Sequence, residues 1–566
     1  MSIYDWIVLV LTLLLIVSYG LYKSRGIQNM DGFFLGNREM PWYTVCFSVM
    51  ATQASAITFL SAPGLAYSKG MSFVQFYFGL PLAMIVLSIT FVPIYHKLKV
   101  FTAYEFLEKR FDVKTRVLTA FLFLIQRGVS TGITIFAPAV ILSTILNLPV
   151  TLTTLFIGVL VILYTVYGGT KAVSFTQLLQ MAIIFGGMLI AGVMVIHLLP
   201  ADIGFKEALH IAGKSGKANA IDWSWDPDNQ YTVWTGIIGG FFLQLSYFGT
   251  DQSQVGRYLT GSSVRESRMG LLMNGLLKVP MQFAILLIGV LVFAYYQYNT
   301  PPLFFNQQEV AKLEQSSYSE EYNKLKIQHE EISGDKKVEV DNLIQALKKD
   351  DQSLVEHTRG QLLLYNQKEA ELREELTTLM QKNDAQAETN DTNYVFLSFV
   401  TNVFPKGLVG LLIAVVFLAS MGATASAINS LASTTTVDVY KRFVNKEGSE
   451  KQYLNASRLF TLIWGVFTVL IALYAGRLGN LLEAVNILGS LFYGTILGVF
   501  LVAFYVKKIG GRAVFYAAVL TEIFVILIWR ADIVAFLWLN LIGCIGVLLF
   551  SFVFRALGVD RKTSNQ

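Results

Sequence analysis

Hydroxyl and amide side chains that could bind a polar solute or a cation lie inside two long apolar segments of this chain. The segment at 42–66 contains Thr52, Gln53, Ser55, Thr58 and Ser61. The segment at 233–255 contains a second group, namely Gln244, Ser246, Tyr247, Thr250, Asp251 and Gln252. Hydroxyl and carbonyl oxygens accept hydrogen bonds and ligate hard cations. Backbone groups freed where such residues interrupt a helix cannot face hydrocarbon, so both segments are predicted to line a polar cavity.

Lys278 is a third candidate, because it lies in the apolar run Leu-Leu-Lys-Val-Pro-Met at 276–281. Burying an ammonium group in a membrane segment is costly. We therefore expect Lys278 to face the cavity and to hydrogen-bond a solute hydroxyl, a carboxylate or a backbone carbonyl. The alternative is that its long side chain reaches the cytoplasmic interface.

A stripe of small and hydroxylated residues marks the segment at 404–437. Its members recur at helical spacing and are Ala419, Gly422, Ala423, Ser426, Ser430 and Ser433. Such a stripe can serve close helix packing alone. The polar run at 434–440 that follows it is hard to explain by packing, and this favours a functional surface.

Membrane-spanning helices must position these residues. The chain has 566 residues, of which 54% are hydrophobic and 15% charged, and this is more apolar surface than one soluble core can bury. The apolar residues gather in blocks of about 20, the length that spans a bilayer. Thirteen blocks are predicted to span, near 2–22, 42–66, 72–95, 117–146, 150–167, 173–199, 233–255, 268–298, 404–437, 455–475, 479–506, 512–530 and 533–555. The predicted fold is an all-α polytopic membrane protein embedded in a lipid bilayer.

The distribution of Lys and Arg predicts the orientation of these spans. Alternate short loops are rich in basic residues, for example Arg25, Lys109, Arg110, Lys441 and Arg442. Basic loops prefer the cytoplasmic side, so the N-terminus is predicted outside and the C-terminus inside a cell membrane. The net charge of +5 then reflects topology and does not indicate nucleic-acid binding.

The two interrupted segments indicate an internal repeat. They are the second and seventh spans, an offset of five that is expected for inverted repeats of five helices each. The first repeat would cover about 42–199, and the second would begin near 233. Helices broken at matching places in two such halves point to a transport site.

The stretch at 303–391 differs from the rest of the chain. It holds 11 Lys and Arg against 19 Asp and Glu, so it belongs in water, outside the cytoplasm. Leucines at helical spacing predict two or more amphipathic helices able to pair as a hairpin, with a break at 333–335. It divides the membrane part into 1–302 and 392–566. We expect a solvated insertion, or else a surface for a protein partner; it lacks the His, Cys or glycine-rich arrangements that would predict an enzyme.

Several motifs together resemble the sodium/solute symporter family, which includes sodium/glucose, proline, sialate and iodide transporters. They lie in the expected order at 33–38, 164–173, 250–258, Asn429 and 438–441. The resemblance covers nearly the whole chain apart from 303–391. It implies a fold of two inverted five-helix repeats with alternating access around a central site.

The resemblance also implies positions for a sodium ion. Backbone carbonyls fall on Ala51 and Ala54, and the small residue before the hydroxyl pair falls on Ala419. The hydroxyl pair itself falls on Gly422 and Ala423, and an aspartate of some members falls on Gln177. These three residues lack the expected ligand atoms. Replacement oxygens could come from Ser420, Thr424 or Ser426.

For the solute, the resemblance implies seven contacts, on Thr58, Phe76, Tyr77, Gln244, Tyr247, Lys278 and Asn486. The function implied is sodium-coupled symport of a small polar solute, either a sugar or an organic anion. The alternative is a sodium-independent facilitator or a proton-coupled transporter, because the sodium ligands are altered. No enzymatic activity and no organic cofactor are expected.

Overall fold

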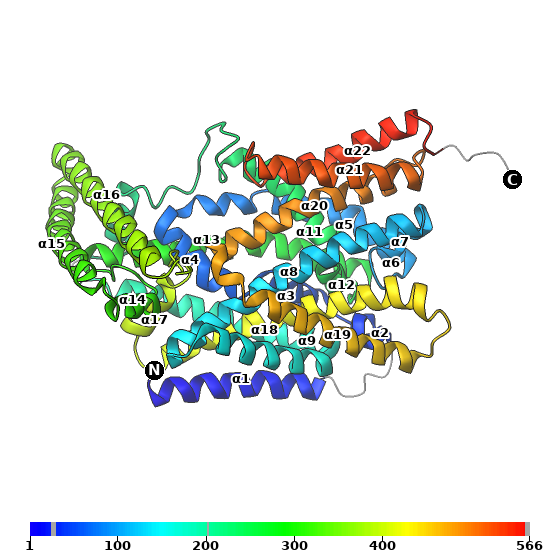
Figure 1. Ribbon diagram of the computed structural model, residues 1–566, viewed down its shortest axis with the longest axis horizontal. Helices are drawn as coiled ribbons and strands as arrows, with labels where there is room; N and C mark the ends of the chain where they lie inside the picture. The colour runs from blue at the N-terminus through cyan, green and yellow to red at the C-terminus, as the bar shows by residue number, and fades with distance from the viewer. Residues whose placement is uncertain (24–29, 201–202, 561–566) are drawn as a thin grey trace.

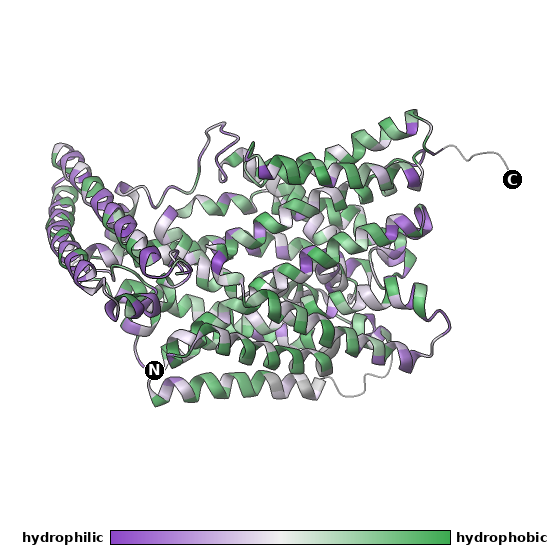
Figure 2. Ribbon diagram, viewed as in Figure 1, coloured by the Kyte–Doolittle hydropathy of each residue, from purple (hydrophilic) through white to green (hydrophobic). Residues whose placement is uncertain are grey.

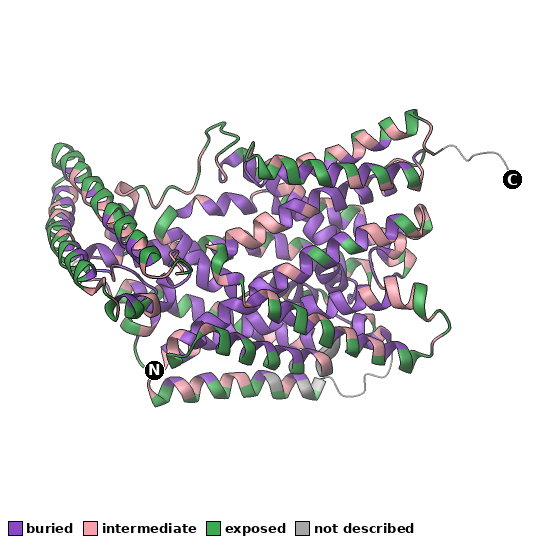
Figure 3. Ribbon diagram, viewed as in Figure 1, coloured by how far each residue is buried: buried purple, intermediate pink, exposed green. Residues whose placement is uncertain are grey.

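An elongated bundle of helices forms the body of the protein, and a helical hairpin projects from one end of it (Figure 1). The computed structural model describes residues 1–23, 30–200 and 203–560. Hydrophobic residues cover much of the bundle, whereas the hairpin is rich in hydrophilic ones (Figure 2). The helices in the middle of the bundle are largely buried (Figure 3). The predicted all-α, polytopic membrane architecture is confirmed.

The helices of the two halves follow the predicted blocks. The first half contains α1 (Ile3–Lys23), α2 (Met30–Leu35), α3 (Trp42–Gln53), α4 (Ala56–Lys69), η2 (Met71–Tyr77), α5 (Leu80–Ile89), α6 (Phe91–Leu98), α7 (Glu105–Arg110), α8 (Val113–Leu146) and α9 (Val150–His197). The second half contains η3 (Thr235–Gly239), α11 (Gly240–Thr250), α12 (Gln252–Tyr258), α13 (Val264–Tyr298), α17 (Val395–Val403), α18 (Leu408–Thr434), η4 (Thr435–Val444), α19 (Glu450–Ala472), η5 (Ala475–Leu478), α20 (Leu481–Tyr505), α21 (Gly511–Arg530) and α22 (Trp538–Ala556).

The number of spans found is lower than thirteen. Within the described residues, ten helices are long and apolar enough to cross a membrane, or eleven when the bent pair α3 and α4 counts as one span. The two remaining predicted spans are Val150–Leu163, which is a shorter apolar helix, and 233–255, which is divided among η3, α11 and α12. The count of thirteen therefore stays a prediction.

Both predicted interruptions are present. Helices α3 and α4 meet at an angle of 59°. The Ser55 amide donates to the Gln53 carbonyl and the Thr58 amide to the Ser55 carbonyl, so Ala51 and Ala54 lose the partners that their carbonyls would have in a continuous helix. In the second half, Asp251 leaves the helical conformation at ψ 118°, and its carboxylate caps α12 by accepting from the Ser253 amide at 2.8 Å.

Helix α9 (Val150–His197) covers two predicted spans, 150–167 and 173–199. Near its start, Thr151 and Thr154 line a cavity together with Lys312 of the insertion. Beyond its end, α10 (Phe205–Lys214) is bonded to the insertion through Lys214 and Glu356. The start of α9 and the helix that follows its end therefore both contact the insertion.

The insertion consists of α14 (Gln307–Glu314) and the long helices α15 (Ser319–Lys349) and α16 (Gln352–Asn383), which pack side by side (Figure 1). The break expected at 333–335 is wrong, because Gly334 lies inside α15. One glycine costs a helix only about 1 kcal/mol, and packing against α16 offsets it. The chain turns instead at Asp350, whose φ is +55°, and Asp351 then caps α16.

The first and the last described helices, α1 and α22, begin and end at opposite ends of the bundle. The N-terminus is at the end that carries the hairpin, and α6, α7 and the C-terminal end of α22 are at the other (Figure 1). This is the relative arrangement that an odd number of crossings requires. Arg25 and the side chains of Tyr164, Tyr167 and Lys171, which belong to the basic loops and motifs described above, lie outside the described part.

Candidate functional site

A cavity lies at the centre of the bundle, where the broken span meets α8, α11, α18 and α20. Six segments supply its lining. They are the broken span (Thr52, Gln53, Ser55, Ile57 and Thr58), η2 (Phe76 and Tyr77), α8 (Gln126, Arg127, Ser130, Thr131 and Thr134), α11 (Leu243 and Tyr247), α18 (Ala423, Thr424 and Ala427) and α20 (Leu482, Val485, Asn486, Gly489 and Tyr493). The two interrupted spans thus line one polar cavity, as the sequence predicts.

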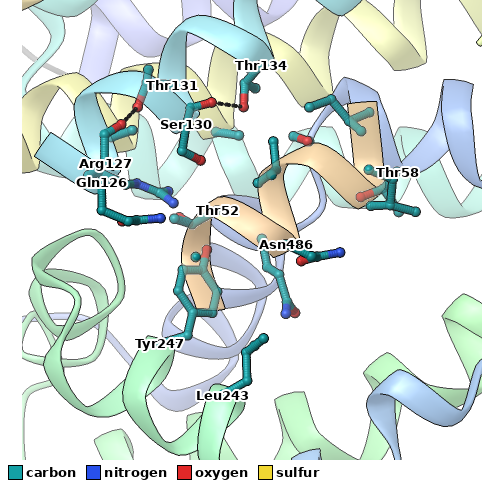
Figure 4. Close-up of a pocket in the computed structure, with 18 of the residues that line it drawn as sticks. Thr52, Thr58, Gln126, Arg127, Ser130, Thr131, Thr134, Leu243, Tyr247 and Asn486 are labelled. Carbon is teal, nitrogen blue, oxygen red and sulfur yellow. Dashed lines mark hydrogen bonds between the residues drawn. The ribbon is translucent and has the colours of Figure 1, made fainter. Parts of the chain in front are cut away.

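One charged side chain, Arg127, lies in this lining. In Figure 4 the Gln126 and Arg127 side chains extend from α8 toward the space bordered by Thr52 and Tyr247. Arg127 is 8% exposed. Arg127 is absent from the site residues predicted from the sequence, although Gln126 and Arg127 interrupt the apolar block at 117–146, just as Lys278 interrupts its own block.

The surroundings of Arg127 leave it incompletely paired. Its Nη1 is 3.9 Å from Asp251 Oδ2, and its guanidinium carbon lies 5.7 Å from the centre of the Tyr247 ring. Arg127 Nε has no hydrogen-bond partner among the described residues. A guanidinium has five N–H donors, so it retains capacity for a ligand.

The carboxylate of Asp251 is well satisfied by neutral donors. Its Oδ1 accepts from the Ser253 amide at 2.8 Å and from the Ser253 hydroxyl at 2.6 Å. Its Oδ2 accepts from the Tyr493 hydroxyl at 2.9 Å. Asp251 therefore does not depend on Arg127 for its hydrogen bonds.

Aromatic residues close the cavity toward the end of the bundle that lies opposite the insertion. The Tyr247 and Tyr493 rings lie 5.7 Å apart, and Gln254 Nε2 donates to the Tyr247 hydroxyl at 2.7 Å. We call Tyr247 and Tyr493 the floor of the cavity. Tyr247 is also one of the seven solute contacts that the family resemblance implies.

A larger cluster closes the cavity toward the insertion. Phe76 stacks on Phe73 with ring centres 5.3 Å apart, and Tyr231 packs edge-on against Phe73 at 5.1 Å. Above them Glu483 accepts from Lys69 Nζ at 2.8 Å and from the Tyr231 hydroxyl at 3.2 Å. Glu483 thus joins α4 to α20 across this closure.

An ion-pair network binds the helices together at the opposite end. Arg116 Nε donates to Asp438 Oδ1 at 2.7 Å, and its Nη1 donates to Glu108 Oε2 at 2.7 Å. Arg442 donates to the other oxygen of Glu108 at 2.9 Å. Burial raises the pKa of the Glu108 carboxyl, but hydrogen bonds from Arg116 and Arg442 outweigh it and lower the pKa below its ordinary value. The network joins α7, α8 and η4, so the polar run at 434–440 has a contact beyond packing.

Five of the seven predicted solute contacts line the cavity, namely Thr58, Phe76, Tyr77, Tyr247 and Asn486. The structure places the other two behind the lining. Gln244 is fully buried, and its Oε1 accepts from Gln53 Nε2 at 3.3 Å. Lys278 is fully buried too, so its side chain does not reach an interface, and its Nζ lies 5.9 Å from the centre of the Tyr77 ring.

The predicted cation positions fall into two groups. In the first group, the carbonyls of Ala51 and Ala54 are freed by the break, and the buried hydroxyls of Ser420 and Thr424 have no hydrogen-bond partner among the described residues. Thr424 also lines the cavity, together with Ala423. These four oxygens are available to a ligand; Ala419 is buried beside them on α18 and offers no side-chain oxygen.

In the second group, Gln177 already occupies the oxygens. Its Nε2 donates to Ser426 Oγ at 3.0 Å, to the Gly422 carbonyl at 3.1 Å and to Thr52 Oγ1 at 3.3 Å. Its Oε1 accepts from Ser48 Oγ at 2.6 Å. We call this set the Gln177 cluster. It is neutral, and the hydrogens of the amide point at the oxygens that a cation would need.

A larger residue in place of Gly422 would require the Gln180 side chain of α9 to move. A Cβ at position 422 would lie 2.5 Å from Gln180 Oε1. The serines farther along the stripe, Ser430 and Ser433, donate to carbonyls of their own helix. The stripe is therefore mixed, with cavity lining at Ala423, a cluster at Ser426 and helix packing beyond.

Comparison with known proteins gives a consistent result. The family model described as "Sodium:solute symporter family" matches residues 33–314 and 375–520. The chain is 24% identical over 546 residues to a sodium/sialic acid symporter of Aliivibrio fischeri, covering 95% of this chain and 90% of that one. It is 31% identical over 301 residues to the human sodium/iodide cotransporter, covering 52% of this chain and 46% of the relative.

A solved structure shares the fold. It is a substrate-bound, outward-open state of a Na⁺-coupled sialic acid symporter, which superposes with a TM-score of 0.75 over 98% of both chains at 22% sequence identity. The insertion residues 315–374 lie outside the family match.

Proposed function

The chain belongs to the sodium:solute symporter family, and from that membership we propose that it is a sodium-coupled symporter of a small organic anion. As a member of this family it is a transporter and not an enzyme. The observation that carries the choice of an anion is Arg127, a buried guanidinium with an unused donor in the lining of the central cavity.

The anion is favoured over a neutral sugar by the energetics of a buried cation. Holding an arginine inside a membrane is expensive unless its charge is compensated. Asp251 lies 3.9 Å away and is bonded to neutral donors, so it compensates Arg127 only in part. The fork of a guanidinium matches the two oxygens of a carboxylate. The cargoes named for two relatives, sialic acid and iodide, are anions at neutral pH.

The other polar residues of the cavity suit the rest of an organic solute. Thr58, Ser130 and Asn486 can hydrogen-bond hydroxyl or amide groups, while Phe76 and Tyr77 offer apolar faces. Gln244 and Lys278 are proposed to act from behind this lining. They would support Gln53 and Tyr77 rather than bind the solute themselves.

We place the sodium ion at the first group of oxygens, the carbonyls of Ala51 and Ala54 and the hydroxyls of Ser420 and Thr424. Na⁺ stripped of water needs several oxygen ligands, and these four are not used within the protein. The carbonyls belong to the broken span and the hydroxyls to α18, which are different parts of the bundle. An ion bound between them would stabilise one relative arrangement of these two parts.

The transport cycle would alternate between opening the two closures of the cavity. Lys69, Glu483 and Tyr231 would separate to admit ion and solute from the side of the insertion, and the floor and the Arg116 network would separate to release them. In the proposed orientation that side is extracytoplasmic, with the N-terminus outside a cell membrane and the C-terminus in the cytoplasm.

Uptake into proteoliposomes tests the proposal. The full chain would be offered labelled N-acetylneuraminate, lactate and glucose under an inward Na⁺ gradient, with choline replacing Na⁺ in matched samples. We expect accumulation of an anion that collapses with choline. Glucose accumulation without anion uptake would refute the solute class, and equilibration regardless of cation would identify a facilitator.

A further inference from the structure

The pairing of Arg127 with Asp251 links the cavity to the break in the second interrupted span. Arg127 projects from α8 into the cavity (Figure 4), and Asp251 is the residue at which α11 ends and α12 begins. Asp251 also accepts from Tyr493 of α20, one of the two residues of the floor. One carboxylate thus contacts the cavity charge, the helix break and the floor.

A bound anion would compete with Asp251 for the same guanidinium. The Arg127–Asp251 separation of 3.9 Å is too long for a strong hydrogen bond, so Arg127 can turn toward a ligand without breaking a hydrogen bond to Asp251. Once it does, the solute carboxylate and Asp251 are two negative charges that share a single cation in a buried region, where Arg127 is 8% and Asp251 1% exposed. Like charges placed so close repel strongly.

We propose that Asp251 is a positioning residue that holds Arg127 in the empty cavity and, when an anion takes Arg127 over, drives the floor open. This deepens the proposed function and rests on the solute being an anion. The driving force is the loss of the counter-charge of Asp251. The path is its bond to Tyr493 and its place at the junction of α11 and α12; α11 carries Tyr247 of the floor, and α12 carries Gln254, which donates to the Tyr247 hydroxyl.

The test separates binding from turnover. Asp251→Asn removes the charge, while its amide group can still accept from Ser253 and still contact the Tyr493 oxygen. Arg127 is then held less tightly, so the affinity for the anion should increase, by about tenfold if the competition is of the usual size for coupled sites. Turnover should fall by a similar factor, because the repulsion that opens the floor is gone.

Tyr493→Phe provides a change of opposite sign. It takes a neutral donor from Asp251 and leaves both charges, so Asp251 should attract Arg127 more strongly. Anion affinity should then fall, by about threefold, the cost of one neutral hydrogen bond. General damage to the site would lower affinity in both variants. Glu522→Gln is a matched control, since Glu522 is a buried carboxylate of α21 outside the cavity lining.

The measurements are titration calorimetry of N-acetylneuraminate, lactate and iodide on the purified full chain, and initial rates of uptake in proteoliposomes for the anion that the wild type binds. Unchanged or weaker binding by Asp251→Asn, or unchanged turnover, overturns the inference while the proposed function stands. If the wild type binds and transports no anion, the proposed function fails and the inference fails with it. If Asp251→Asn cannot be purified folded, the affinity of Tyr493→Phe decides: a value at or above that of the wild type overturns the inference.

Discussion

Two buried polar regions contact the same broken span, and they differ in charge and in how completely their polar groups are hydrogen-bonded. The first region, formed by α8 and α11, contains two charged side chains, Arg127 and Asp251. Arg127 keeps one N–H donor without a hydrogen-bond partner among the described residues. The Gln177 cluster between α3, α9 and α18 carries no charge, and both polar atoms of the Gln177 amide are bonded within the protein. Buried polar groups that are fully bonded rigidify a structure, whereas an unsatisfied one is costly unless a ligand completes it.

We therefore expect the region of Arg127 to bind a ligand and the Gln177 cluster to hold helices together. The resemblance to the family directs attention to Gly422, Ala423 and Gln177 as ion ligands, yet the amide of Gln177 already donates to the oxygens there. The unused oxygens lie nearby, on Ser420 and Thr424. We therefore expect the sodium ligands among these unused oxygens and not at positions 422, 423 and 177.

Replacing Arg127 should have the largest effect. Arg127→Gln removes the cation that we assign to the solute, and anion affinity should fall by about 30-fold or more, or at least ~2 kcal/mol. Arg127→Lys keeps the charge without the fork and should retain part of the affinity. Calorimetry with the anion that the wild type binds measures both.

Arg268→Gln is the control for this change, because Arg268 is an arginine of α13 that donates to the Ser88 carbonyl and does not line the cavity. If Arg127→Gln binds the anion as tightly as the wild type, the solute does not bind at Arg127. The distinction between a binding region at Arg127 and a structural Gln177 cluster would then fail.

Removing an unused hydroxyl should weaken sodium binding. Thr424→Val keeps the shape of the side chain and deletes one proposed ligand, so the Na⁺ concentration for half-maximal uptake should rise by about tenfold, the effect of one lost bond to a charged group. Ser430→Ala is the matched change on the same helix, where the hydroxyl donates to the Ala427 carbonyl. A Na⁺ dependence unaltered by Thr424→Val, or shifted equally by Ser430→Ala, would exclude Thr424 as a ligand.

A substitution in the Gln177 cluster should lower the stability of the protein without weakening ion or solute binding. Gln177→Leu removes the hydrogen bonds of Gln177 to Ser48, Ser426 and the Gly422 carbonyl; Ser48 keeps Ser174 and Ser426 keeps Thr52 as partners, so we expect a cost of about 1 kcal/mol per lost bond. The melting temperature in detergent should fall, while Na⁺ and anion affinities of the folded protein stay within about twofold of wild type. A large loss of Na⁺ affinity at unchanged melting temperature would instead assign the cluster to the ion.

The fold and the main site could be predicted to different depths. Apolar blocks and their polar interruptions predicted the helices and both breaks, because a polar residue at mid-membrane is costly unless it faces a cavity or a bonding partner. Arg127 was equally visible as an interruption at 117–146, but the average apolarity of that block concealed it.

Three-dimensional relations could not be read in the same way. Whether Lys278 lines the cavity or lies behind Tyr77 depends on the rotation of α13 against η2, which no residue spacing fixes. The bonds of Gln177 join residues more than 120 positions apart, so the sequence does not show that its amide is already engaged. In the insertion, Gly334 looked like a break because a glycine is weak in an isolated helix, and the packing of α16 overrides that weakness.

The smallest predicted effect extends the comparison outside the membrane, to Glu388 at the base of the insertion. Its Oε2 accepts from the Tyr394 hydroxyl at 2.8 Å and from Asn306 at 3.3 Å, both neutral donors. Burial raises the pKa of Glu388 to about 7, against about 4.3 in an unfolded chain. Between these two values the folded carboxyl holds a proton that the unfolded one has lost. The stabilisation is therefore complete below about pH 4.3 and is lost as the pH rises through about 7.

Hydrogen exchange of the segment at 384–394 in the full-length protein measures this effect. Protection should be greater at about pH 5.5 than at about pH 8, after correction for intrinsic exchange, and Glu388→Gln should remove the difference because its amide stays neutral at both values. Glu356→Gln, a change on the exposed surface of α16, should leave the difference in place. Equal protection of the wild type at the two pH values would mean that neutral donors alone accommodate a buried carboxylate at Glu388, as they nearly do at Asp251. It would then weaken the view that an incompletely compensated charge distinguishes the regions that respond to ligand or pH from those that do not.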